Sequence, residues 1–174
     1  MGASLAAGYV ENGGVTCPWH AWRFSVTTGS WLDNPKSTLR QDTFEVRVED
    51  FVAVQEVGRV INPVLAAGQI EGGVAQGIGW AIFEQVVWRE GRMANGQMTN
   101  YIMPTSMDLP PIRVEFVEFP YPHGPGGAKG IGELPMDGPA PAIFNAVRNA
   151  TGIEVTRLPL TPEDLSLLWE EGNR

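Results

Sequence analysis

The sequence predicts an α+β fold in which a small antiparallel β segment is followed by a mixed α/β segment built on one long glycine-rich helix. Two patterns predict it. Short strand-like runs separated by turns occupy the first 50 residues, whereas apolar residues recur every four positions after Asn62-Pro63. We therefore expect two segments, 1–50 and 51–174, with a boundary near Asp50.

Short β signals define the first segment. Gly14–Thr16 and Trp22–Val26 are strand-like runs, and apolar residues alternate over 44–48 as they do in a half-buried strand. Glu49-Asp50 is expected to turn this last strand back onto Phe51–Gln55 as a hairpin. The first segment is thus predicted to be a partial antiparallel sheet.

One long helix is expected near the start of the second segment, and Glu84–Arg92 should contain its end and a turn. Its apolar positions recur every four residues over about five turns. It also contains several glycines, each of which costs about 1 kcal/mol relative to alanine. Such a cost indicates that another backbone packs closely on the glycine face. The apolar positions are Ile70, Val74, Ile78, Ile82 and Val86, and the glycines are Gly68, Gly72, Gly73, Gly77 and Gly79.

The remaining elements are short. Apolar residues alternate over Ile112–Phe116 as in a strand, and 120–135 is a loop rich in glycine and proline. A helix is expected between Pro139 and Gly152, because proline favours the first helical turn and glycine the position after the last. Thr161-Pro162-Glu163-Asp164 combines an N-cap, a proline and an acidic first turn, which predicts a final helix through Leu168.

Composition and charge exclude several function classes. The 174-residue chain has 12 Lys and Arg against 20 Asp and Glu, a net charge of −8, and its basic residues are scattered. This argues against nucleic-acid or membrane-surface binding. No apolar run approaches the roughly 20 residues of a membrane span, and the first residues lack a signal-peptide pattern. We expect a soluble, cytoplasmic protein whose partner is a small molecule or another protein.

A candidate metal-binding pair is formed by Cys17 and His20, which enclose Pro18-Trp19. A thiolate and an imidazole three positions apart on a turn can bind one metal ion, but a metal site needs further ligands. Cys17 is the single cysteine, and the other histidine, His123, is distant in sequence. From the residues alone, a chance placement of the pair at a strand end is the favoured interpretation.

The residues around this pair resemble the second half of a Rieske-type ferredoxin domain. The resemblance implies that Cys17 and His20 are the Cys-x-x-His pair among the ligands of a [2Fe–2S] cluster. In that family a Cys-x-His pair supplies the other ligands, and its place would fall immediately before Met1. We therefore expect this chain to bring half of the ligand set. The matching residues are Gly2–Leu5, Gly8–Phe24 and Thr28-Gly29.

A candidate catalytic acid, Glu133, follows Gly130-Ile131-Gly132 and precedes Pro135. Glycines allow a backbone to approach a ligand closely, and a carboxylate whose position is set by such a loop suits a general base. The alternative from spacing alone is an ordinary surface loop with one solvated acid.

The second segment is similar to the C-terminal end of the large subunit of molybdenum hydroxylases, the xanthine dehydrogenase and aldehyde oxidase family. The resemblance implies that Glu133 is the catalytic base of a hydroxylation and that Gln69 hydrogen-bonds a molybdopterin cofactor. It also implies that Gly130 and Gly132 lie at this cofactor, with Gln76 a weaker candidate. The matching residues are Val57–Pro63, Gly68–Gly79, Tyr101–Pro104, Asp108–Pro110, Gly127–Glu133, Ala140–Val147 and Leu160–Glu163.

Three hypotheses follow for function. The first is an oxidoreductase fragment of molybdenum hydroxylase type, incomplete alone, whose partners are the rest of the large subunit or other redox subunits. The second is a Rieske-type electron-transfer module. The third is a truncated fusion of two genes without activity. Retention of a molybdenum cofactor would favour the first hypothesis, and its absence would favour the third.

Overall fold

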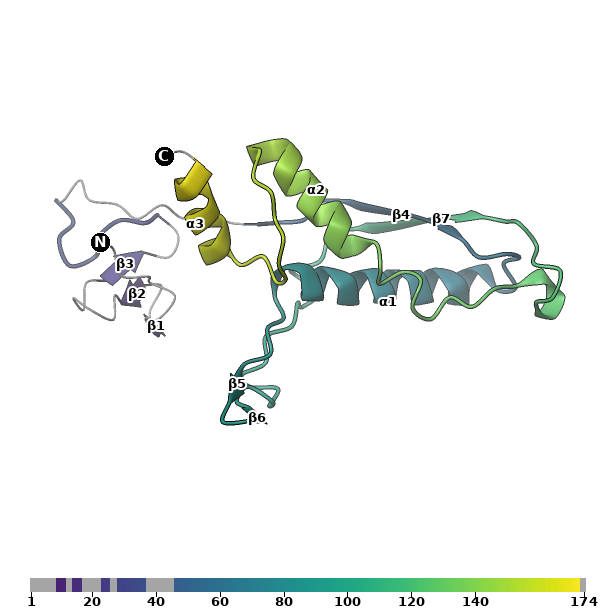
Figure 1. The fold of residues 1–174 in the computed structure, drawn as a ribbon, viewed down its shortest axis with the longest axis horizontal. Helices are drawn as coiled ribbons and strands as arrows, with labels where there is room; N and C mark the ends of the chain where they lie inside the picture. Colours follow the sequence, from purple (N-terminus) through teal and green to yellow (C-terminus); the bar gives the residue numbers. More distant parts are fainter. Residues whose placement is uncertain (1–8, 12–13, 17–22, 26–27, 37–45, 173–174) are drawn as a thin grey trace. The chain divides into compact units, whose positions relative to one another are not determined.

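The computed structural model describes residues 1–174 except 1–8, 12–13, 17–22, 26–27, 37–45 and 173–174, and Figure 1 shows its ribbon. The chain forms two compact units. One contains residues 1–46 and 161–174, and the other contains residues 47–160. The last 14 residues thus belong to the same unit as residues 1–46.

The first unit contains a small antiparallel sheet of three strands, β1 (Tyr9–Glu11), β2 (Gly14–Thr16) and β3 (Arg23–Ser25), in that order. The prediction of antiparallel strands in this segment is confirmed, and β1 is an additional strand. Asp33 accepts hydrogen bonds of 2.8 Å from both the backbone N–H and Nε of Arg23. These bonds, the backbone one first, lower the pKa of Asp33.

The last helix, α3 (Pro162–Gly172), also belongs to the first unit and begins where the sequence predicts. Thr161 Oγ1 accepts from the Asp164 backbone N–H at 3.2 Å, and Asp164 Oδ2 accepts in return from the Thr161 hydroxyl at 2.9 Å. This reciprocal bonding satisfies N–H groups that a helix start leaves without partners.

The second unit is built on a parallel pair of strands, β4 (Phe51–Glu56) and β7 (Ile112–Val117), which are in register from Phe51 opposite Ile112 to Glu56 opposite Val117. The expected hairpin at Glu49-Asp50 is wrong for the described residues, since 46–50 form no strand and β4 pairs with β7. Parallel strands need a long crossover connection, and α1 supplies it here. The mixed α/β character of this segment is confirmed.

The long helix, α1 (Pro63–Ile82), begins one residue after Asn62, whose side chain accepts from the Leu65 backbone N–H at 3.1 Å. It packs against α2 (Pro139–Thr151) and β7. The predicted stripe is buried at Ile70, Val74, Ile78 and Ile82, the first three being fully buried. Val86 is a correction: it lies beyond the helix and is exposed. The helix ends earlier because the N–H groups of Phe83 and Glu84 both bond to the Gly79 carbonyl.

Several remaining elements are short. A hairpin of β5 (Trp88–Arg89) and β6 (Arg92–Met93) turns through Glu90 and Gly91, which both have positive φ. A single 3-10 turn, η2 (Pro125–Gly127), lies in the glycine- and proline-rich loop. The helix α2 starts at Pro139 and ends at Gly152 in a left-handed conformation (φ 77°), as predicted. In the portion that the structure describes, no helix has both the length and the apolar character needed to cross a membrane.

The glycines of α1 fall into two groups. A Cβ added at Gly73 would overlap the ring of Pro135, and one at Gly77 would meet Cγ of Pro139 at 2.6 Å. Gly79 is covered by Pro104 in the same way. Close packing is therefore found at these positions, and side chains, mainly proline rings, supply most of it where another backbone was expected. Among the described residues, a Cβ at Gly68 or Gly72 would instead meet nothing within 4 Å.

Candidate functional site

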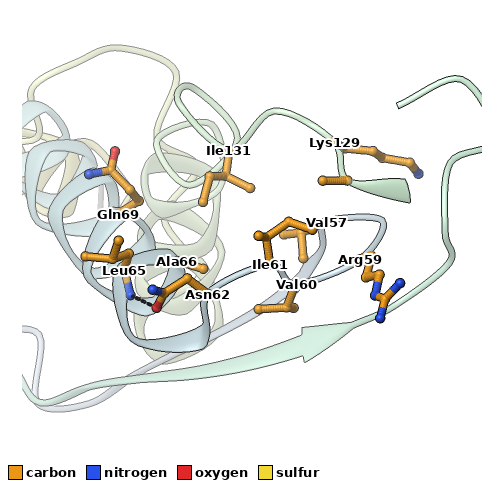
Figure 2. Close-up of a pocket in the computed structure, with 11 residues that line it drawn as sticks. Val57, Arg59, Val60, Ile61, Asn62, Leu65, Ala66, Gln69, Lys129 and Ile131 are labelled. Carbon is orange, nitrogen blue, oxygen red and sulfur yellow. Dashed lines mark hydrogen bonds between the residues drawn. The ribbon is translucent and has the colours of Figure 1, made fainter. Parts of the chain in front are cut away.

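A hollow of about 200 Å³ lies in the second unit between the first turns of α1, the connection from β4 to α1 and the loop that follows η2 (Figure 2). Gln69 and Leu65 stand on the helix side, whereas Ile131 and Lys129 come from the loop. Most of its lining is apolar. The lining residues are Val57, Arg59, Val60, Ile61, Asn62, Leu65, Ala66, Gln69, Ala128, Lys129 and Ile131.

The loop is attached to the end of β4 by backbone hydrogen bonds. The Gly127 carbonyl accepts from the N–H groups of Arg59 at 2.9 Å and Tyr121 at 2.8 Å. The Lys129 N–H donates to the Val57 carbonyl at 3.0 Å, and Gly58 forms an isolated β-bridge with Ala128. These bonds set the position from which the Gly130–Glu133 segment leaves the sheet.

A carboxylate at the end of β4 completes this attachment. Glu56 Oε1 accepts from the Gly58 N–H at 2.7 Å and the Phe119 N–H at 3.3 Å, while Oε2 pairs with Lys129 Nζ. The hydrogen bond from Lys129, followed by that from Gly58, lowers the pKa of Glu56. Nearby, Glu118 Oε1 accepts from the Val60 N–H at 2.6 Å and ties the end of β7 to the same connection.

The structure brings part of the predicted cofactor site together. Gln69 is exposed on α1 and lines the hollow, opposite Lys129 and Ile131. Gly130 and Gly132 alternate with Ile131, and a Cβ at either glycine would meet nothing within 4 Å. Gln69 therefore borders the hollow, and no described residue covers the Cβ positions of the two loop glycines.

The predicted catalytic residue, Glu133, is not among the residues that line this hollow. Glu133 is exposed, and its carbonyl accepts from the Met136 N–H at 2.9 Å, which closes a turn leading to α2. Its carboxylate follows Ile131 by two positions along the loop. Gln76 is exposed one helical turn or more beyond the hollow and is not among the lining residues.

The predicted iron–sulfur ligands, Cys17 and His20, lie outside the described residues. They fall in sequence between β2 and β3. Among the residues whose placement is described, no group of three or more His, Cys, Asp and Glu side chains could hold a metal ion.

The structure adds residues that the sequence reasoning missed. Arg59 and Lys129 bring cationic side chains to the rim of the hollow, and Asn62 caps α1 at its floor. The signal for Asn62 was present, because Asn followed by Pro is a common helix start. Lys129 had a weaker signal, a charged residue inside a run of glycines.

Two protein families match this chain. Residues 38–110 match the molybdopterin cofactor-binding domain, and residues 1–48 match the Rieske [2Fe-2S] domain. The two matches share residues 38–48, close to the junction expected near Asp50.

Curated relatives support the first match. The xanthine dehydrogenase molybdenum-binding subunit of Escherichia coli O157:H7 is 42% identical over 123 residues, which are 70% of this chain and 16% of that subunit. The aldehyde oxidoreductase molybdenum-binding subunit PaoC of Escherichia coli (strain K12) is 40% identical over 126 residues, 71% of this chain and 17% of that subunit. The chain thus spans about one sixth of the length of these relatives.

Solved structures agree. Quinoline 2-oxidoreductase from Pseudomonas putida 86 matches with a TM-score of 0.66 and 36% identity, over 72% of this chain and 16% of that one. Aldehyde oxidoreductase from Desulfovibrio gigas matches with a TM-score of 0.65 and 30% identity, over 86% of this chain and 15% of that one. The chain therefore contains part of the molybdopterin-binding region of the xanthine dehydrogenase and aldehyde oxidoreductase large subunits, preceded by a Rieske [2Fe-2S] domain match.

Proposed function

We propose that this chain is a C-terminal, cofactor-binding piece of a molybdenum hydroxylase, and that it acts only together with the rest of the large subunit. One observation carries the proposal: Gln69 and the loop before Gly130 line the same hollow. No described residue lies within 4 Å of a Cβ added at the neighbouring glycines, Gly68 and Gly130. The hollow of about 200 Å³ is smaller than the roughly 300–1,000 Å³ of complete ligand sites. These residues would thus form one wall of a cofactor site.

The residues fit a molybdopterin at this wall. The amide of Gln69 can donate and accept hydrogen bonds without adding charge, which suits a ring that has both donors and acceptors. Gly68, Gly72, Gly130 and Gly132 leave space that any side chain would fill. When bound, the cofactor would supply the redox chemistry, and this chain would orient it.

Glu133 is proposed as the catalytic base, which accepts a proton at its carboxylate as the substrate is hydroxylated. Its exposed position leaves the carboxylate free to meet substrate once other parts of the enzyme cover the loop. The turn closed by the Met136 N–H holds the Glu133 backbone in place. This bond limits the movement of the backbone from which the carboxylate extends.

Complementation tests the proposal. We would express the 174-residue chain with a xanthine dehydrogenase-type large subunit lacking the corresponding segment, purify the complex and measure its molybdenum content. The complex should retain molybdenum, and Gln69→Ala should lower this content several-fold. Gln97→Ala, an exposed glutamine in the loop after β6, is the matched control and should have no effect. A complex without molybdenum, or equal losses in both variants, would refute the proposal.

A second function is supported by the family match of residues 1–48. We propose that a Rieske-type [2Fe–2S] cluster uses Cys17 and His20 and two further ligands that lie outside the given 174 residues. Iron reconstitution of the chain with its redox partner should give the EPR signal of a histidine-ligated cluster, and Cys17→Ala should remove it. A signal that survives this substitution would exclude Cys17 as a ligand.

A further inference from the structure

Side-chain contacts of Glu56 add to the backbone hydrogen bonds that attach the loop to the end of β4. The carboxylate of Glu56 contacts three segments: the turn at Gly58, the residue Phe119 after β7, and Lys129 of the loop. It is thus the side chain through which both strands of the parallel pair and the loop are joined.

The fit at Gly58 shows how close these segments lie. Gly58 has a φ of +71°, and a Cβ added there would meet the Gly127 carbonyl oxygen at 2.5 Å and the Lys129 nitrogen at 3.0 Å. Only glycine tolerates both the conformation and the contact. The two backbones are therefore in direct contact at the point where Glu56 and Lys129 pair.

The second ion pair on the same strands provides a comparison. Asp50 and Arg113 pair at 2.5 Å at the start of β4 and β7, with side chains 52% and 64% exposed. The side chains of Glu56 and Lys129 are 34% and 38% exposed. In the described residues, no backbone N–H donates to Asp50 in addition to Arg113. Partial shielding and added N–H donors make the pair at the loop the stronger restraint.

We propose that Glu56 and Lys129 are positioning residues of the cofactor site, whose ion pair fixes the Gly130–Glu133 segment relative to Gln69. The ion pair itself is observed, whereas its role in positioning a cofactor site rests on the proposed function. Neither residue needs to touch the cofactor. Lys129 places the glycines that follow it, and Glu56 fixes Lys129 to the sheet.

Amide hydrogen exchange on the full chain tests this restraint. Lys129→Met and Glu56→Gln should each accelerate exchange about fivefold at the amides of Arg59 and Lys129, whose hydrogen bonds join loop and strand. Exchange in the α1 core, at Ile70 and Ile78, should not change. A merely structural pair would instead accelerate exchange in both places, because it would lower the stability of the whole unit.

Two further variants complete the design. Lys129→Arg keeps the charge and should restore slow exchange, whereas Arg113→Met removes the other ion pair and should leave the Arg59 and Lys129 amides unchanged. Unchanged exchange in Lys129→Met and Glu56→Gln would overturn the inference, as would an equal effect of Arg113→Met.

The measurement separates this inference from the proposed function. Exchange is read on the chain without a cofactor, so it decides whether the pair restrains the loop even if the complemented complex retains no molybdenum. Conversely, molybdenum retention with unchanged exchange would support the function and overturn the positioning role.

Discussion

The two glycine-containing faces of α1 differ in how closely other segments of the chain pack against them. On one face of α1, Gly73 and Gly77 lie under Pro135 and Pro139, so the absent side chains are replaced by proline rings. On the other face, a Cβ added at Gly68 or Gly72 would meet no described residue within 4 Å. Val64, next to Gly68 on the open face, is 81% exposed.

This difference shows at which positions of α1 the packing of the fold accounts for a glycine. A helical glycine costs about 1 kcal/mol relative to alanine, and close packing offsets this cost at Gly73 and Gly77. No contact with a described residue offsets this cost at Gly68 and Gly72. Under the proposed function, the cofactor and the rest of the large subunit lie there. Substitutions on the open side should therefore change activity, and those on the packed side should change stability.

The largest effect is expected at Glu133, in the loop before α2. Glu133→Gln in the complemented enzyme should lower kcat by about 10²-fold or more, because an amide cannot accept the proton. Thermal unfolding of the chain should stay unchanged, since the side chain is exposed. Glu115→Gln, an exposed glutamate on β7, is the control. Turnover at the unaltered rate in Glu133→Gln would contradict the base assignment.

A packed glycine should give the next largest effect. Gly77→Leu should destabilise the chain by about 1–3 kcal/mol, because Pro139 and the Met136 carbonyl leave no room for a side chain. Urea unfolding measures the loss. A change below about 0.5 kcal/mol would mean that this face of α1 is not packed as described.

The open glycines should respond with the opposite sign. Gly72→Ala should stabilise the isolated chain by up to about 1 kcal/mol, since alanine favours the helix and the added Cβ meets nothing. In the complemented enzyme, the same substitution should reduce molybdenum retention. If Gly72→Ala destabilises the isolated chain, the two faces do not differ in packing.

The smallest effect concerns pH. Hydrogen bonds from Lys129 and Gly58 lower the pKa of Glu56 below its ordinary value of 4.5, so the folded state favours the ionised form. The stability this contributes is present above pH 4.5 and is lost as pH falls through the lowered pKa. Glu56→Gln should therefore weaken the loss of stability on acidification, measured by urea unfolding at neutral pH and below pH 4.5. An unaltered pH dependence would argue against the pair.

The sequence by itself determined the local elements. Asn62-Pro63 set the start of α1, Pro139 and Gly152 bounded α2, and Thr161 with Asp164 capped α3. Each depends on dihedral preferences or on bonds between residues a few positions apart, which a linear pattern records. The buried stripe of α1 followed from its period for the same reason, up to the point where Val86 left the helix.

The tertiary structure alone decided the long-range pairings. The pattern of Phe51–Gln55 fits a hairpin and a parallel strand equally well, and only its pairing with β7 some 60 positions later selects between them. The same holds for Glu56, whose bonds to Phe119 and Lys129 span 63 and 73 residues. Which glycines of α1 are packed was likewise decided by Pro135 and Pro139, because contacts between distant segments depend on how the whole chain folds back on itself.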